Sequence, residues 1–297
     1  MTILKNILMA TVCGVIFTGG AFAQKKAVKK EMAIQLYSAK DMIGNAENYV
    51  KNHERLFKAI ADAGYTGVET ANYKNGLIYG VTPEEFKADL DAAGLKAISA
   101  HINKHLSDTE KQTGDFSESL AWWEEAIKIH KIIGVKYLVC PSLRVKTLAE
   151  LKQYCEYYNE VGRRCNAAGI KFGYHNHSHE FVKIEGEVML DYMLQNTDPE
   201  CVFFQMDVYW AVIGKASPVD YFKKYPGRWT MLHIKDKKEI GQSGMVGFDA
   251  IFRNCEEAGM KDYVIEIESC RGDSVLEPMA ASAEYLRTAP FVKKKYE

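Results

Sequence analysis

The sequence predicts an α/β fold, a single-domain (β/α)8 TIM barrel, because of a repeated pattern, the chain length and the lack of a linker. Five amphipathic stretches each end in a glycine that an apolar or alternating run follows directly. Glycine readily takes the left-handed conformation that ends a helix, and the run behind it has the pattern of a strand. Helix, glycine and strand repeated in this way indicate parallel βα units. The five glycines are Gly64, Gly94, Gly134, Gly169 and Gly259.

Eight strands emerge when the gaps in the repeat are filled. Two starts lack the glycine: Asp198-Pro199 precedes the sixth strand and Pro226-Gly227 the seventh. With the first 23 residues set aside, the 297-residue chain is close to the size of one barrel. We expect a TIM barrel domain over residues 32–297. Its strands are expected to begin near Met32, Tyr65, Leu95, Val135, Ile170, Cys201, Trp229 and Asp262.

The N-terminal residues have the pattern of a secretory signal peptide over residues 1–23. Lys5 precedes an apolar run, and Ala21-Phe22-Ala23 forms the expected cleavage site. The run is too short to span a bilayer comfortably, although an uncleaved N-terminal anchor is the alternative. We expect a soluble, exported, periplasmic protein with no membrane association after cleavage, and a flexible mature N-terminus over residues 24–31.

Charge and cysteine usage restrict the partners and the cross-links. The chain has 38 basic and 39 acidic residues, which gives no basic surface for nucleic acid. No CxxC spacing occurs, and a barrel of this size needs no disulfides. We therefore expect a small-molecule partner and buried thiols, and a homo-oligomer stays possible. Of the seven cysteines, Cys13 lies in the predicted signal peptide, and the other six are Cys140, Cys155, Cys165, Cys201, Cys255 and Cys270.

Polar residues stand at the expected C-terminal ends of nearly all the strands. Side chains at alternate positions near these ends point into one shared pocket of a barrel. A buried charge costs several kcal/mol unless it is paired or bound to a metal. Asp207, His233 and Glu266 come from consecutive strands, and each alone fits a satisfied polar group at the rim, but these three with His175 indicate a cation site. The polar residues at the strand ends are Gln35, Tyr37, Glu69, His101, His175, Asp207, His233, Lys235, Glu266 and Glu268.

The stretch YHNHSHE, residues 174–180, places three imidazoles and a carboxylate at one strand end. Imidazole and carboxylate together suit a borderline divalent cation, whereas the alternative is a polar loop with surface histidines. The barrel pattern makes His175 the ligand. It leaves His177 and His179 beside the site or at the surface, and makes Glu180 a candidate acid or base.

Four segments make the chain resemble the xylose-isomerase-like TIM barrels, the sugar isomerase/epimerase superfamily. They are IQLYS (34–38), GYHNHSHEF (173–181), the run from Phe203 to Asp236 that ends in HIKD, and VIEIES (264–269). The likeness extends from about Met32 to Leu286 and is strongest to an exported bacterial subgroup with YHNH and HIKD motifs. The superfamily also contains hydroxypyruvate isomerase, ketose 3-epimerases, inosose dehydratase and barrel-type apurinic endonucleases.

The resemblance implies one divalent metal ion held by four side chains from the last four strands. Carried over, the ligands are His175, Asp207, His233 and Glu266. The epimerases have a glutamate at the place of His175, so the two-base arrangement of a 3-epimerase is broken here. The mixed ligands suit Mn, Zn, Co or Mg.

The chemistry that the resemblance implies is abstraction of a proton next to a sugar carbonyl through a metal-stabilised enediolate. The first hypothesis is a sugar isomerase or epimerase. Its rival is a lyase or hydratase that eliminates from a 3-keto-glycoside, suggested by His175 and by export. A non-catalytic sugar-binding protein is a lesser alternative, and charge disfavours a nuclease.

Secondary roles follow from the same resemblance. Glu180 and Glu268 are the main candidates for the acid or base, and Glu69 is a further one. Lys235 is expected to pair with a substrate oxygen or with Glu268. The expected substrate-binding residues are Gln35, Tyr37, His101, His177 and Trp210.

Overall fold

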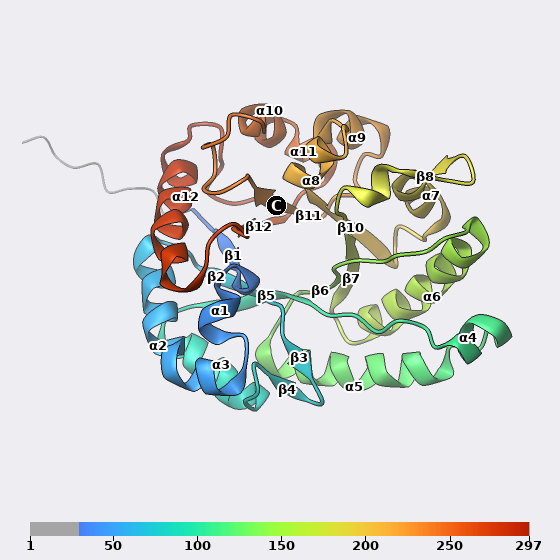
Figure 1. The fold of residues 1–297 in the computed structure, drawn as a ribbon, viewed down its shortest axis with the longest axis horizontal. Helices are drawn as coiled ribbons and strands as arrows, with labels where there is room; N and C mark the ends of the chain where they lie inside the picture. Colours follow the sequence, from blue (N-terminus) through green and yellow to red (C-terminus); the bar gives the residue numbers. More distant parts are fainter. Residues whose placement is uncertain (1–29, 297) are drawn as a thin grey trace, which may run out of the picture.

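Eight parallel strands form a closed barrel with helices around it, in a computed structural model that describes residues 30–296 (Figure 1). The strands follow one another around the barrel in the order β1, β2, β5, β6, β7, β10, β11 and β12, and β12 pairs with β1 to close it. The predicted fold class is confirmed. The predicted signal peptide and residues 24–29 lie outside the described residues.

The barrel strands begin within two residues of the predicted positions. Each pairs in parallel with the next, so all eight carboxyl ends meet at one face of the barrel. Their bounds are β1 Ala33–Gln35, β2 Gly67–Thr70, β5 Lys96–His101, β6 Tyr137–Cys140, β7 Lys171–His175, β10 Val202–Asp207, β11 Met231–Lys235 and β12 Asp262–Glu266.

Helices connect the strands and cover the outside of the barrel. The five glycines of the repeat all have positive φ, between 72° and 100°, as the helix-ending role requires. The helices are α1 Lys40–Ile43, α2 Ala46–Ala63, α3 Pro83–Ala92, α4 Asp108–Thr113, α5 Ser117–Ile133, α6 Leu148–Ala167, α7 Met189–Asn196, α8 Val208–Ile213, α9 Pro218–Lys224, α10 Phe248–Arg253, α11 Cys255–Ala258 and α12 Leu276–Thr288.

Short elements follow several strands on the face toward the viewer in Figure 1. They are the 3-10 turns η1 Leu36–Ala39, η2 His179–Phe181 and η3 Gly272–Val275, and the hairpins β3 Tyr73–Lys74 with β4 Leu77–Ile78 and β8 Lys183–Ile184 with β9 Glu187–Val188.

Apolar side chains fill the barrel near the strand starts, and polar ones fill it near the strand ends. On β10, Phe203 belongs to the apolar cluster, and Gln205 and Asp207 follow it with the same inward parity. This division leaves the carboxyl-end layers for chemistry. The apolar cluster is Ala33, Tyr137, Val139, Phe203, Met231 and Val264.

The cysteine prediction is confirmed for all six thiols, which are free and buried. Lys30 and Glu31, the last two residues of the predicted flexible N-terminus, contact the C-terminal part of the chain. Lys30 is buried and donates hydrogen bonds to two carbonyls near the end of α12, and the Glu31 N–H donates to the Lys294 carbonyl. Within residues 30–296, no helix combines the length and apolar character needed to cross a bilayer.

Candidate active site

Four potential metal donors meet at the carboxyl ends of four neighbouring strands. His175 ends β7, Asp207 ends β10, His233 lies in β11 and Glu266 ends β12. One donor atom from each lies within 4.8 Å of the others, and all four residues are buried. The four residues named from the sequence therefore form one buried His/Asp/Glu cluster, consistent with a divalent metal site.

Asp207 leaves one carboxylate oxygen without a partner. Its Oδ1 accepts a hydrogen bond of 2.8 Å from the Trp210 N–H and caps α8. Its Oδ2 is buried and has no hydrogen-bond partner among the described residues. Burial raises the pKa of Asp207, because the charged carboxylate is less stable in this buried position than in water when no cation is bound. An unpartnered buried carboxylate oxygen among imidazoles fits a bound divalent ion.

The two histidines of the cluster each face a protein oxygen on one side and the other donors on the opposite side. His175 Nδ1 lies 3.0 Å from Gln205 Oε1, and its Nε2 lies 4.0 Å from Asp207 Oδ2. Burial holds the pKa of His175 well below its usual value, so the ring is neutral and can bind a metal.

His233 lies between two carboxylates. Its Nε2 is 2.7 Å from Glu69 Oε1, and its Nδ1 is 3.1 Å from Glu266 Oε2. Burial alone would lower the pKa of His233, but the two carboxylates raise it to about 10. With this pKa, both ring nitrogens of His233 carry a proton when no cation is bound. A cation at Nδ1 would replace the proton on that nitrogen.

Lys235 joins the cluster to the mouth of the barrel. Its Nζ lies 3.1 Å from Glu266 Oε2, donates a hydrogen bond to Glu268 Oε2, and stands 5.1 Å above the ring of Trp210. Carboxylates raise the pKa of Lys235 although burial opposes them, so it stays an ammonium ion. The Glu268 side chain is 33% exposed, which leaves it accessible from the mouth.

Glu69 is a structural anion rather than a free base. Its oxygens accept hydrogen bonds from Gln35 Nε2, Ser99 Oγ and Gln205 Nε2 at 2.6–2.9 Å, in addition to that from His233. Burial opposes it, but the charges of His101 and His233 and the hydrogen bonds from His233 and Ser99 hold the pKa of Glu69 at about 2. The contacts argue against the prediction that Glu69 removes a substrate proton.

The Gln35 side chain is also held by protein contacts. It is fully buried, its Nε2 donates to Glu69, and its Oε1 accepts from the Tyr37 N–H. The nitrogen and the oxygen of the amide thus both form hydrogen bonds within the protein, which argues against contact with substrate. Sequence reasoning missed Ser99 and Gln205 in this network. Gln205 has the inward parity of Asp207, two residues earlier on β10, which is the signal that could have identified it.

Glu180 points away from the four donors. The Tyr174 hydroxyl donates to Glu180 Oε1 at 2.7 Å, and the His177 N–H donates to Oε2 at 2.8 Å. Tyr174 has the opposite parity to His175, so its side chain faces the helical layer. Glu180 is fully buried and braces the loop after β7. These contacts argue against its predicted role as acid or base.

His177 and Trp210, also named from the sequence, lie beside the cluster. His177 packs edge-on against His175, with ring centroids 5.0 Å apart, and lies 5.7 Å from the ring of Trp210. His177 Nδ1 and Trp210 Nε1 are buried and have no hydrogen-bond partner in the described part of the chain. Tyr37 is 40% exposed, with Lys40 Nζ 3.9 Å from its ring centroid.

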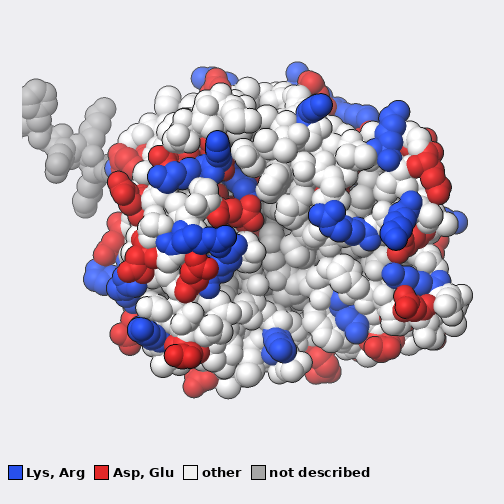
Figure 2. All heavy atoms as spheres, in the orientation of Figure 1, with Lys and Arg blue, Asp and Glu red and all other residues white. Residues whose placement is uncertain are grey.

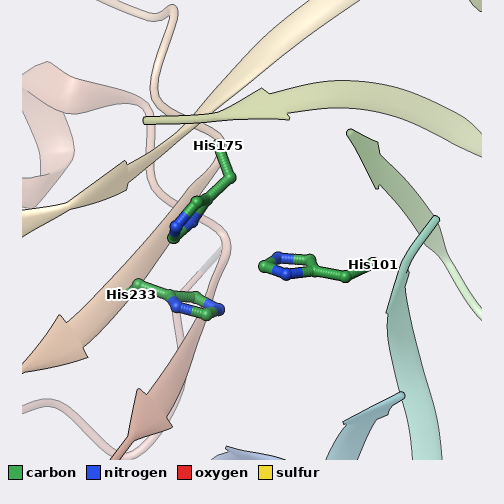
Figure 3. Close-up of side chains that lie close together, drawn as sticks. All are labelled: His101, His175 and His233. Atoms are coloured by element: carbon green, nitrogen blue, oxygen red, sulfur yellow. The ribbon is translucent and has the colours of Figure 1, made fainter. Parts of the chain in front are cut away.

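His101, predicted to contact substrate, belongs to a group of three imidazoles. Figure 3 shows His101, His175 and His233 converging from three strands. His101 stacks on His233 at 5.1 Å, and its Nε2 lies 2.7 Å from Gln205 Oε1.

The face drawn in Figure 2 is hollowed at its centre, and charged side chains gather on the left of the hollow and are scattered elsewhere. A cavity of about 450 Å³ also lies at the opposite end of the barrel, near the strand starts. Its charged lining includes exposed Lys96 and Lys261 and the ion pair of Lys136 with Asp262. The clustered imidazoles and buried carboxylates lie at the strand ends, so we place the candidate active site there.

Known proteins of similar sequence and structure include sugar-converting barrels. A family model described as xylose isomerase-like TIM barrel matches residues 57–289. A crystal structure described as a sugar phosphate isomerase/epimerase from Parabacteroides distasonis superposes with a TM-score of 0.82. It is 34% identical, and the match covers 91% of this chain and 97% of that one.

More distant matches carry two kinds of description. An L-ribulose 3-epimerase structure has a TM-score of 0.66 at 13% identity, covering 86% of this chain and 93% of that one, which shows the fold alone. The inosose dehydratase of Geobacillus kaustophilus is 23% identical over 213 residues, which are 66% of this chain and 65% of that enzyme. That of Clostridium beijerinckii is 23% identical over 82% of this chain and 89% of that enzyme.

Proposed function

Because this chain belongs to the xylose isomerase-like TIM barrel family, we propose that it is a divalent-metal-dependent enzyme that removes a proton next to the carbonyl of a sugar. The observation that carries the proposal is the unpartnered, buried Asp207 Oδ2 inside a cluster of imidazoles and carboxylates. A buried charge of this kind requires a cation partner.

His175 Nε2, Asp207 Oδ2, His233 Nδ1 and Glu266 would hold the ion. When bound, a divalent ion polarises a carbonyl oxygen and makes the neighbouring carbon-bound proton more acidic. The donor set accepts Mn, Zn, Co or Mg.

Glu268 is the proposed base. It is a partly exposed carboxylate at the mouth, and one of its oxygens, Oε2, accepts from Lys235, whereas both oxygens of Glu69 and both of Glu180 accept hydrogen bonds from the protein. Lys235 donates to Glu268 and keeps a positive charge beside it. The ammonium group can also donate to a substrate oxygen once the carboxylate takes up a proton.

Elimination is the outcome that the donor arrangement favours. His175 uses Nδ1 toward Gln205 and Nε2 toward the other donors, so it has no lone pair for a second proton transfer. One base is enough to remove a proton before a leaving group departs from the adjacent carbon, as in a 3-keto-glycoside lyase or hydratase. Similarity to inosose dehydratases supports this choice.

Isomerisation or epimerisation of a sugar is the second candidate. The structure at 34% identity that is described as a sugar phosphate isomerase/epimerase favours it. In either reaction, His177 Nδ1 and Trp210 Nε1 supply unpartnered polar atoms for sugar hydroxyls, and exposed Tyr37 offers a ring to a sugar face. The expected export would bring the enzyme to glycosides.

The reaction can be tested with a 3-keto-disaccharide in D2O, using metal-loaded wild type and Glu268→Gln. We expect wild type to release the second sugar and the variant to lose 10²–10⁴-fold in kcat, the usual contribution of a general base. Deuterium incorporation without bond cleavage would instead identify an isomerase or epimerase. Sugar binding that survives EDTA, with neither reaction, would identify a binding protein.

A further inference from the structure

Three imidazoles lie next to the four metal donors and could themselves be a second metal site. One nitrogen each of His101, His175 and His233 lies within 4.8 Å of the others (Figure 3). Three imidazole nitrogens with free lone pairs would bind a divalent cation. Which of these nitrogens carry protons therefore decides the role of the group.

The hydrogen bonds of Gln35 and Glu69 fix the direction of the network. The Tyr37 N–H donates to Gln35 Oε1 at 3.1 Å, so the Gln35 NH2 group faces Glu69 Oε1 at 2.7 Å. A carboxylate accepts hydrogen bonds and does not donate them. Glu69 Oε2, 2.9 Å from Gln205, must therefore face the Gln205 NH2 group. This orientation turns Gln205 Oε1 toward the imidazoles.

The oxygen atoms then assign the ring protons. Gln205 Oε1 only accepts, and it lies 2.7 Å from His101 Nε2 and 3.0 Å from His175 Nδ1. Both nitrogens must carry hydrogen. Glu69 Oε1 likewise lies 2.7 Å from His233 Nε2, which must also carry hydrogen. These three nitrogens are thus hydrogen-bond donors rather than metal ligands.

We propose that Glu69 and Gln205 are positioning residues that hold these imidazoles in fixed tautomers. The three-histidine group is then a set of N–H donors and not a second metal site. The opposite nitrogens, His175 Nε2 and His233 Nδ1, present their lone pairs to one ion beside Asp207 and Glu266. This inference rests on the proposed function for the place of that ion.

Tautomers can be read in the full chain labelled with ¹⁵N-histidine. In metal-free protein, we expect long-range ¹H–¹⁵N spectra to show His175 protonated at Nδ1 and bare at Nε2. After Zn²⁺ is added, His233 should keep its proton at Nε2 and bind through Nδ1. The reverse tautomer at His175 would overturn the proposal, and this measurement needs neither a variant nor a sugar.

Metal affinity gives the second measurement. Gln205→Met keeps the length of the side chain but removes the oxygen that accepts from His101 and His175. We expect the Zn²⁺ affinity measured by calorimetry to fall about 10–100-fold, the usual loss when a hydrogen-bond partner of a metal-binding histidine is removed. Ser119→Ala is the control, since it removes a buried hydroxyl that donates to Glu110 and makes no contact with Glu69, Gln205 or the imidazoles. Unchanged affinity in Gln205→Met, or two ions bound per wild-type chain, would overturn the proposal.

The two proposals can fail separately. Expected tautomers and Zn²⁺ affinities without turnover of any keto-sugar would overturn the proposed function alone. Turnover with the reverse His175 tautomer would overturn the positioning role alone.

Discussion

At the scale of single residues, Asp207 combines two roles through its two oxygens. Oδ1 caps α8 through the Trp210 N–H, and Oδ2 is left for a cation. Asparagine in its place would keep an oxygen for the cap and lose the charge. The substitution therefore separates metal binding from the local structure.

We predict that Asp207→Asn loses its stabilisation by Mn²⁺. A ligand at 100 times its Kd stabilises the folded protein by about 2.7 kcal/mol, and we expect this gain in wild type but not in the variant. Urea unfolding with Mn²⁺ and with EDTA measures it. Asp273→Asn is the control, because that carboxylate pairs with Arg55 at the surface. Equal Mn²⁺ stabilisation of wild type and Asp207→Asn would contradict the proposed site.

His130 gives the protein a pH-dependent stability that is separate from the site. It is fully buried in α5, its Nδ1–H donates to the Ala126 carbonyl, and its Nε2 has no partner within the described residues. Burial lowers the pKa of His130 to about 4. The unfolded chain, with an ordinary histidine pKa, binds the proton first as the pH falls.

We predict that stability falls by about 3 kcal/mol between about pH 6.5 and pH 4 through His130, since each pKa unit is worth about 1.4 kcal/mol. His130→Phe keeps a ring in the core and should lose this part of the pH dependence. Unfolding by urea at several pH values tests the difference between the two proteins. The prediction fails if the two curves run parallel.

At the scale of elements, the contact between β7 and β10 depends on a glycine, Gly173, which has no side chain. Gly173 and Phe203 are direct partners in the ladder, and both face the barrel interior. A Cβ on Gly173 would lie 2.5 Å from two atoms of the Phe203 ring. The apolar layer beneath the site therefore requires glycine at this position.

We predict that Gly173→Ala destabilises the protein by about 1–3 kcal/mol, the usual cost of overpacking a core. Gly247→Ala is the matched control, because the nearest atom to its Cβ, outside its chain neighbours, is 4.0 Å away. Urea unfolding of both variants gives the comparison. Equal stabilities of the two variants would contradict the steric argument.

At the scale of the whole molecule, the two ends of the described chain are joined at the barrel closure. Lys30 Nζ, just before β1, donates to the carbonyls of Leu286 and Ala289 at 2.8 and 2.7 Å. β1 and β12 pair beside this contact and close the barrel. The contact thus holds the last helix against the first strand.

We predict that Lys30→Ala destabilises the protein by about 1.5–3 kcal/mol, the range for hydrogen bonds to a charged group. Lys58→Ala removes an exposed ion pair with Asp62 and should cost less than about 1 kcal/mol. Thermal and urea unfolding of the full chain measure both changes. A loss no larger than that of the control would show that the contact adds nothing to barrel closure.

The sequence by itself determined the order of strands and helices and the inward residues at the strand ends. Both are local properties, because glycine ends a helix within one turn and side chains alternate along a strand. His175, Asp207, His233 and Glu266 could be named for the same reason. Their parity and place at the strand ends do not depend on distant contacts.

Only the tertiary structure decided what each polar side chain contacts. His233 and Glu69 are 164 residues apart in the chain, yet they form one hydrogen bond of 2.7 Å. Glu180 lies close to His175 in sequence and is instead turned toward Tyr174. Hydrogen-bond partners depend on how strands from distant parts of the chain are brought together, so periodicity placed the four candidate donors at the strand ends but did not reveal the hydrogen bonds around them.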